Sequence, residues 1–289
     1  MPQANEALAE RACAKINLSL HVVGRRDDGY HLLESLVAFT EGGDLLHFEP
    51  GSDLTLDIRG PFAQGLEGGD GNLVVRAARA LGIDTGRIVL EKHLPIASGI
   101  GGGSADAAAT LRGLMRRAGL KLDDGALKAL ALRLGADVPV CLDQRACFMS
   151  GIGEVITPVP ALPPVAILLV NPLVGVATAD VFRALGLGIG PREGSEHPAL
   201  PPRWRDGRDL AGFLAACRND LEQPALAIAP VIGEVLSALQ QQKGCLVARM
   251  SGSGATCFGL FDTLAEAEEA ERAIRARSPG WWGMASRLR

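Results

Sequence analysis

The segment PIASGIGGGSADAAATLRGLM, from Pro95 to Met115, places a run of glycines directly before a run of good helix formers. Four of the five residues from Gly99 to Gly103 are glycine, and the alanine-rich part that follows has apolar residues at helical spacing. The first turn of a helix carries unpaired N–H groups and a partial positive charge. Glycines let that backbone come close to the oxygens of an anion. The segment therefore predicts a phosphate-binding loop at the start of a helix.

The same residues exclude two better-known phosphate loops. No Gly-Lys-Ser/Thr triplet follows the glycines, and their spacing misses the G-x-G-x-x-G pattern. Ser104 is expected to cap the helix or to bind a phosphate or its metal ion, and Asp106 suits the positive end of the helix. A flexible loop that lets a helix approach a strand closely is the structural alternative.

The composition indicates a globular protein and argues against nucleic acid as a partner. The chain has 289 residues, 47% hydrophobic and 21% charged, with a formal net charge of −4. This length suits two domains, and the acidic balance provides no field that would gather DNA or RNA. The N-terminal residues show no signal-peptide pattern, and no apolar run reaches membrane-spanning length. We therefore expect a cytoplasmic protein with no membrane partner.

The cysteines and histidines are expected to have no metal-binding role. The six cysteines include no C-x-x-C pair, and the five histidines do not lie near them at metal-ligand spacing. Buried, reduced thiols are the expected state.

The first half of the chain mixes strand and helix patterns without strict alternation, which predicts an α+β fold. The residues from Ala12 to Val23 alternate between apolar and polar and predict one half-buried strand. Asn72 is placed to cap a helix that Gly82 ends. The other elements expected in this half are a strand that follows Tyr30 and His31, strands within 51–60 and 86–95, and helices over 104–118 and 123–134.

Four prolines within residues 157–164 predict a break in regular structure and a domain boundary, which gives domains 1–160 and 161–289. Residues 186–209 are expected to form a long surface loop. Thr263 and Glu266 have the spacing of a capping box at the start of a helix. The remaining expected elements are strands over 165–170, 245–250, 256–261 and 281–286, and a helix over 231–242.

The pattern P-x-x-x-G-[IL]-G-G-G-S-[AS], as it stands from Pro95 to Ala105, resembles the phosphate loop of the GHMP kinases, the galactokinase, homoserine kinase and mevalonate kinase family. Further segments resemble motifs of the same family, in the same order. They are AKINLSLHVVGRRDDGYH (14–31), GNLVVRAA (71–78), LGADVPV (134–140) and SGSGATCFGLF (251–261). The resemblance implies a two-lobed α+β fold, with an S5 domain 2-like N-terminal lobe, a ferredoxin-like C-terminal lobe and the active site in the cleft.

The resemblance also implies a reaction. The DGYH and GADVPV segments are similar to those of a member that phosphorylates, with ATP and Mg²⁺, the 2-hydroxyl of a cytidyl diphosphate derivative of methylerythritol in non-mevalonate isoprenoid biosynthesis. The implied partner is that small molecule, and the implied state of the protein is a monomer or a weak homodimer.

The resemblance assigns two catalytic residues. Asp137 is implied to be the general base that takes the proton of the attacking hydroxyl, and Lys15 to be its partner. A helix C-terminus disfavours an added negative charge, so a carboxylate just after a helix needs a cation to stay ionised. The structural alternatives are a turn carboxylate before Pro139 and a solvated strand lysine.

Binding residues follow from the same resemblance. Tyr30, the only tyrosine, and His31 are implied to recognise the cytosine ring, with a loop aromatic that covers a core edge as the alternative. Asn17 shares a strand face with Lys15, and Thr178 matches a substrate-side threonine or a helix N-cap. Substrate contacts are thus expected at Asn17, Tyr30, His31, Thr178, Gly252, Ser253 and Gly254. Nucleotide contacts are expected at Asn72, Lys92, Pro95, Ile96, Ala97, Ser98, Gly99, Ile100, Gly101, Gly102, Gly103, Ser104 and Ala105. Metal contacts are expected at Ser104 and Asp137.

Several of these residues have ordinary structural explanations. An N-cap explains Asn72, a strand-end lysine explains Lys92, and a tight hairpin explains the glycines at 252 and 254. Two other functions stay open at this stage. One is a family member that acts on homoserine or mevalonate, whose substrates carry no base to stack on Tyr30. The other is a catalytically silent nucleotide- or RNA-binding protein, which the acidic charge balance disfavours.

Overall fold

The computed structural model describes residues 8–289 and divides the chain into two compact units that are interleaved along the sequence. Among the described residues, unit 1 contains residues 8–14, 43–96 and 101–143. Unit 2 contains residues 15–42, 97–100 and 144–289. Two strands, β1 (Leu8–Asn17) and β3 (His31–Glu49), therefore contribute residues to both units.

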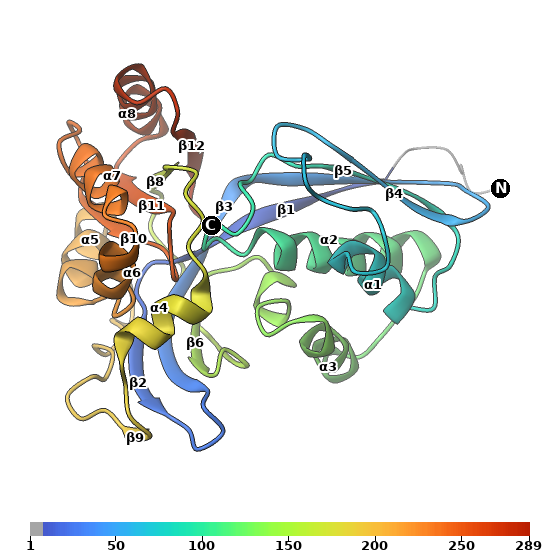
Figure 1. The fold of residues 1–289 in the computed structure, drawn as a ribbon, viewed down its shortest axis with the longest axis horizontal. Coiled ribbons are helices and arrows are strands. Elements are labelled where there is room, and N and C mark those ends of the chain that lie inside the picture. Colours follow the sequence, from blue (N-terminus) through green and yellow to red (C-terminus); the bar gives the residue numbers. More distant parts are fainter. Residues whose placement is uncertain (1–7) are drawn as a thin grey trace. The chain divides into compact units, whose positions relative to one another are not determined.

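Unit 1 combines strands with a group of helices (Figure 1). Strands β4 (Leu54–Arg59) and β5 (Gly86–Glu91) pair in parallel, and β5 pairs antiparallel with the last residues of β3. Its helices are α1 (Leu73–Ala80), α2 (Gly102–Ala118) and α3 (Asp124–Leu134), followed by the short 3-10 helix η1 (Pro139–Cys141). Helix α2 packs closely because Gly113 leaves room for Phe48, whose ring would lie only 2.2 Å from an added Cβ.

Unit 2 contains a four-stranded antiparallel sheet in the order β10-β11-β8-β12. Its strands are β8 (Ala166–Asn171), β10 (Val247–Met250), β11 (Cys257–Phe261) and β12 (Trp282–Arg287). Helices α7 (Val231–Gln240) and α8 (Leu264–Arg277) pack against this sheet around a continuous hydrophobic core. Every residue of β8 and β11, the two central strands of this sheet, is buried.

The remaining strands of unit 2 belong to the sheet that contains the first residues of β3. Strand β2 (His21–Arg25) pairs with β3 and with β9 (Gly190–Pro191), and β6 (Cys147–Gly151) pairs with β3 and with β7 (Val155–Pro158). Three further helices belong to this unit: α4 (Thr178–Leu185), α5 (Gly207–Ala216) and α6 (Glu222–Ile228).

The α+β prediction is confirmed, and most predicted elements are present within a few residues of their expected ends. Asn72 caps α1 by accepting a hydrogen bond from the N–H of Val74 at 3.0 Å, and α1 ends at Ala80, shortly before Gly82. Thr263 and Glu266 form the predicted capping box of α8. Helices α5 and α6 were not predicted.

The prediction of one strand from Ala12 to Val23 is wrong. The backbone changes hydrogen-bond partners at Leu18–Leu20. The N–H groups of Leu18 and Ser19 both donate to the carbonyl of Leu36, whereas the N–H of Leu20 donates to the carbonyl of Arg218. Strand β1 therefore ends at Asn17, and β2 begins at His21.

The prolines of 157–164 do not exclude regular structure at their first positions. Pro158 is the last residue of β7 and lies opposite Cys147 of β6. A proline is accepted there because, among the strands of residues 8–289, β7 pairs only with β6, so its other edge needs no N–H donor. The division between domains 1–160 and 161–289 stays a prediction.

Candidate active site

The glycine segment has the backbone of an anion-binding loop. Gly99 and Gly101 have φ angles of 77° and 64°, in the left-handed region that favours glycine. Gly101 is the N-cap of α2, and no side chain caps this helix end. The first helical hydrogen bond runs from the N–H of Ala105 to the carbonyl of Gly101. The N–H groups of the three residues before Ala105 are thus the ones that a helix N-terminus offers to an anion.

Two expectations about this helix end are wrong. Ser104 does not cap α2, because Gly101 occupies the cap position in a left-handed conformation. Asp106 is not in the first turn and does not face solvent, but is buried within α2 with only 4% of its surface exposed. The proposed contact of Ser104 with a phosphate or metal stays a prediction.

A buried ion cluster lies below the start of α2. The ammonium of Lys92 donates to Asp106 Oδ2 at 2.7 Å and to Asp44 Oδ2. Asp44 Oδ1 accepts the backbone N–H groups of His93 and Leu94 at 2.6 and 2.8 Å. The cluster thereby ties α2 to β3 and to the segment after β5. A Cβ on Gly102 would lie 3.2 Å from Lys92 Nζ, so the cluster reaches the glycine loop itself.

Burial sets the protonation of this cluster. It raises the pKa of Asp106 to about 7, against the attraction of Lys92, and the nearby Asp44 adds to the rise. Burial acts to lower the pKa of Lys92, but the two carboxylates outweigh it and raise that pKa above its ordinary value. Asp106 Oδ1 is buried without a hydrogen-bond partner among residues 8–289. Lys92 is therefore a charged lysine enclosed by carboxylates, and its nucleotide contact stays a prediction.

In unit 2, the middle of the loop lies on a second glycine turn. The Ser251 hydroxyl donates to the carbonyl of Gly99 at 3.3 Å, and the N–H of Thr256 donates to the carbonyl of Ser98 at 3.2 Å. A Cβ on Gly99 would lie 2.6 Å from the carbonyl oxygen of Gly254. Gly252 contacts the loop equally closely, since a Cβ added to it would lie 2.9 Å from the carbonyl oxygen of Gly99. Both segments need glycine where their backbones touch.

Two of the predicted substrate positions, Asn17 and Thr178, lie against this turn. Asn17 donates its amide N–H₂ to Ser35 Oγ at 2.8 Å and its backbone N–H to Ser251 Oγ at 3.1 Å. Thr178 Oγ1 and Ser253 Oγ lie 2.8 Å apart and share a hydrogen bond. Thr178 is the first residue of α4 and not its cap, since Ala177 holds that position. The structure thus brings Asn17, Thr178 and the glycine turn together, whereas their contact with a substrate stays a prediction.

Tyr30 and His31 stand at the start of β3 with different surroundings. Tyr30 is 60% exposed. The ring of His31 stacks on Phe182 of α4, with ring centroids 4.6 Å apart and an interplanar angle of 26°. Burial lowers the pKa of His31, and the charge of Arg25 adds to this effect. Phe182 was missed by the sequence analysis, because nothing in its local pattern distinguishes it from an ordinary helix residue that faces the core.

The two predicted catalytic residues belong to different units, so their pairing stays a prediction. Lys15 lies on β1 with 4% of its surface exposed, and its backbone N–H donates to the carbonyl of Ile100 at 3.0 Å. Asp137 is half-buried in the turn between α3 and η1, as expected for a residue that follows a helix end.

The fold also gathers three residues that sequence spacing kept apart. The ligand atoms of His21, His197 and Cys217 lie within 4.8 Å of one another. However, His21 is bonded to two carbonyls and to the N–H of Arg218, and His197 to Ser19 Oγ at 2.6 Å and the carbonyl of Pro198. Both nitrogens of each ring are therefore engaged, and hydrogen bonding alone explains the cluster.

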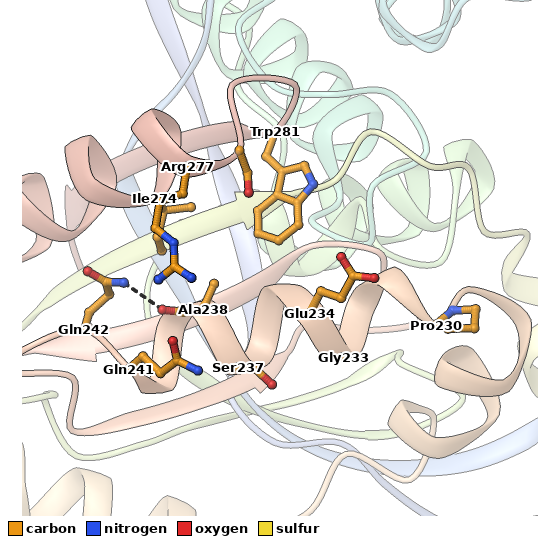
Figure 2. A pocket seen from close by; sticks show the side chains of 11 residues that line it. Pro230, Gly233, Glu234, Ser237, Ala238, Gln241, Gln242, Ile274, Arg277 and Trp281 are labelled. Carbon is orange, nitrogen blue, oxygen red and sulfur yellow. Dashed lines mark hydrogen bonds between the residues drawn. The ribbon is translucent and has the colours of Figure 1, made fainter.

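A surface pocket elsewhere in unit 2 contains none of the predicted site residues. It has a volume of about 520 Å³ and lies between α7 and α8, with Trp281, Glu234 and Arg277 on its walls (Figure 2). None of the helices in residues 8–289 is long and apolar enough to cross a membrane.

Sequence models of one family match both halves of the chain. The model described as "GHMP kinases N terminal domain" matches residues 72–151, and "GHMP kinases C terminal" matches residues 203–280. The first match includes α1, the glycine loop and Asp137, and the second includes the glycine turn at 251–254.

Individual relatives agree with the family match. A protein of Cereibacter sphaeroides named 4-diphosphocytidyl-2-C-methyl-D-erythritol kinase is 54% identical over 272 residues, which cover 94% of this chain and 95% of that protein. A crystal structure of 4-(cytidine 5'-diphospho)-2C-methyl-D-erythritol kinase superposes with a TM-score of 0.76 at 36% identity, covering 97% of this chain and 98% of the other. A homoserine kinase from Cytophaga hutchinsonii superposes with a TM-score of 0.67 at 17% identity, covering 99% of this chain and 96% of the other, which indicates a shared fold.

Proposed function

The chain belongs to the GHMP kinase family, and on that premise we propose that it phosphorylates the 2-hydroxyl of 4-diphosphocytidyl-2-C-methyl-D-erythritol with ATP, giving the 2-phosphate and ADP. The observation that carries the proposal is the 54% identity, over 94% of this chain, to a protein named for that kinase. The proposal places the protein in the cytoplasm, as a monomer or weak homodimer, in non-mevalonate isoprenoid precursor biosynthesis.

The nucleotide's phosphates would bind at the start of α2. This end of the helix fits an anion because it has a left-handed glycine cap and no side-chain cap. Mg²⁺ bound with ATP would neutralise charge on the phosphates. Ser104 and Asp137 are the residues proposed to hold it, and their hydroxyl and carboxylate oxygens are the donors that Mg²⁺ prefers.

Asp137 and Lys15 would handle the acceptor alcohol. In this proposal the Asp137 carboxylate takes the proton of the 2-hydroxyl as its oxygen attacks the γ-phosphorus of ATP. Lys15 keeps that carboxylate ionised and faces the negative charge of the transferred group. Because phosphoryl transfer is largely dissociative, the orientation of the hydroxyl contributes as much as proton removal.

The cytosine ring would be recognised at the start of β3. Tyr30 is exposed enough to stack on a flat base, and His31 is held in place by its own stacking on Phe182. This recognition separates the proposed substrate from homoserine and mevalonate, which carry no base.

The proposal is tested by incubating the purified protein with Mg·ATP and each of three alcohols: the cytidyl diphosphate substrate, homoserine and mevalonate. We expect ADP release only with the first, and ³¹P NMR should place the new phosphate on the 2-position. Equal turnover with homoserine or mevalonate, or none with any alcohol, would reject the proposed function.

Two variants test the assigned roles in the same assay. Asp137→Asn should lower kcat by about 10²- to 10⁴-fold while ATP still binds, because it removes the general base and leaves the glycine loop intact. Tyr30→Ala should raise KM for the cytidyl substrate more than KM for ATP. Near-normal turnover of the first variant, or an unchanged ratio of KM values in the second, would contradict the role concerned.

A further inference from the structure

We propose that Asn219 is a positioning residue of the active site, which fixes the glycine turn Ser251–Gly254 and, through that turn, the middle of the phosphate loop. Asn219 lies between α5 and α6 and is 8% exposed. The inference rests on the proposed function, because it assumes that the loop binds the nucleotide.

The Asn219 side chain uses both of its amide N–H donors and its carbonyl oxygen. Its amide nitrogen donates to the carbonyls of Met250 and Gly252, each at 2.8 Å. Its Oδ1 accepts the N–H of Leu221 at 3.0 Å, which fixes the orientation of the amide. One side chain thus holds the turn at both the residue before it and a residue within it.

The backbone of Asn219 is itself held firmly. Leu20 bonds to both neighbours of Asn219: its N–H donates to the carbonyl of Arg218, and its carbonyl accepts the N–H of Asp220, each at 2.8 Å. The side chain of Asn219 therefore projects from a fixed base and not from a mobile loop.

Glu222 completes the support from the first residue of α6. Its Oε2 accepts the N–H of Met250 at 3.0 Å. Met250 ends β10, an edge strand of the sheet, so its outward N–H and carbonyl have no neighbouring strand to bond with. Glu222 and Asn219 supply those two partners.

The turn transmits this support to the loop. Ser251 donates to the carbonyl of Gly99, and Gly252 and Gly254 touch Gly99 at distances that leave no space for a Cβ. Ser253 on the same turn shares a hydrogen bond with Thr178. A shift of the turn would therefore move the loop and the substrate-side hydroxyls together, and misplacements of about 1 Å can cost about 10²-fold in rate.

The test replaces Asn219 with Asp, which keeps the size and the Oδ1 acceptor but puts an oxygen against two carbonyl oxygens. The matched control is Gln242→Glu, which removes a single amide-to-carbonyl bond, 2.8 Å long, to Ala238 beside the surface pocket (Figure 2). We expect kcat/KM for ATP to fall about 10²-fold in Asn219→Asp and to keep the wild-type value in the control.

A second pair of variants tests Glu222. Glu222→Gln should stay active because its amide oxygen still accepts from the N–H of Met250, whereas Glu222→Ala should lose activity because it has no acceptor.

Amide hydrogen exchange supplies a readout that does not depend on activity. In Asn219→Asp, or in Asn219→Ser if the first variant does not fold, exchange should rise at residues 97–100 and 251–256 and stay unchanged in α7. A folded variant with wild-type kinetics and exchange would overturn the positioning role. A wild-type protein without kinase activity would instead reject the proposed function, while the exchange result would still report on the turn.

Discussion

Each unit buries one cluster of titratable side chains, and the two clusters differ in charge. In unit 1, Lys92 stands between Asp44 and Asp106 in an ion cluster. In unit 2, His21, His197 and Cys217 form a cluster that is neutral, because burial lowers the pKa of His197 to about 4 and raises that of Cys217 to about 11. The first cluster keeps the charge of Lys92 and pairs it with carboxyl groups, whereas the other cluster avoids charge.

The difference follows from the hydrogen bonds available to each group. The Asp44 carboxylate receives two backbone N–H groups as well as the ammonium, so its charge is satisfied inside the protein. His197 Nδ1 donates to the carbonyl of Pro198 and Nε2 accepts from the Ser19 hydroxyl, which a neutral ring does with its one proton, and nearby Arg218 and Arg249 disfavour a second. A buried group stays ionised where a counter-ion lies beside it, and a buried base stays neutral where its neighbours are cationic.

The largest effect is expected when the cation is removed from the charged cluster. Lys92→Met keeps much of the volume but leaves the buried carboxyl groups of Asp44 and Asp106 without their cation, so the free energy of unfolding should fall by about 3–5 kcal/mol. Urea unfolding measures this change. The matched control is Arg79→Met, which breaks the surface pair of Arg79 with Asp70 in the same unit and should change stability far less. If both variants lost the same free energy of unfolding, the buried Lys92 cluster would stabilise the protein no more than a surface ion pair does.

The next effect concerns pH and the carboxyl of Asp106. Because its pKa rises from 3.8 to about 7 on folding, between these values the native protein holds a proton that the unfolded chain has released. This group therefore costs stability as the pH rises through that window, by up to about 1.4 kcal/mol per pH unit. Asp106→Asn keeps an oxygen for Lys92 and cannot titrate.

Urea unfolding in metal-free buffer between pH 4.5 and 8 measures the contribution of Asp106. The stability of the wild type relative to Asp106→Asn should decrease from pH 4.5 to 7 and then level off. A difference that is flat across the window would show that Asp106 has the same pKa in both states.

The neutral cluster should give a pH dependence of the opposite sign. Between pH 6.5 and about 4 the unfolded chain protonates His197 while the native protein does not, so wild-type stability is lost as the pH falls. The glutamine of His197→Gln cannot titrate. As the pH falls through this window, the free energy of unfolding of the wild type should decrease relative to that of the variant. The lowered pKa of His21 works in the same direction and persists in the variant. A relative stability that rises on acidification would contradict the neutral state of His197.

The sequence predicted those features that depend on neighbouring residues. The glycine loop, the Asn72 cap and the capping box at Thr263 each depend on residues within a few positions of one another, and all three are present. The prediction that Ser104 caps α2 is wrong for an equally local reason, because Gly101 adopts the left-handed conformation and occupies the cap position itself.

The supports of the site could not be predicted, because their partners come from distant parts of the chain. Asp44 and Lys92 are 48 positions apart, and Asn219 is 33 positions from Gly252. Asp44, Asn219 and Glu222 look like ordinary polar residues until the fold shows which backbone groups they bind. The family resemblance identified the residues proposed to touch the ligand, but not the side chains that hold them in place.

The smallest effect separates two adjacent glycines and tests how far the charged cluster extends. A Cβ on Gly103 would have only ordinary contact, 3.7 Å from Leu73 Cδ1, so Gly103→Ala should raise the free energy of unfolding by up to about 1 kcal/mol through helix propensity. A Cβ on Gly102 would lie 3.2 Å from Lys92 Nζ and 3.8 Å from Asp44 Oδ2. Gly102→Ala should therefore lose that gain, because the methyl group displaces the ammonium from its carboxylates. Urea unfolding measures the difference in free energy of unfolding between the two variants. In a Lys92→Met background this difference should vanish, since the ammonium is then absent. A difference that persists there would place its cause in the loop backbone instead of the ion cluster.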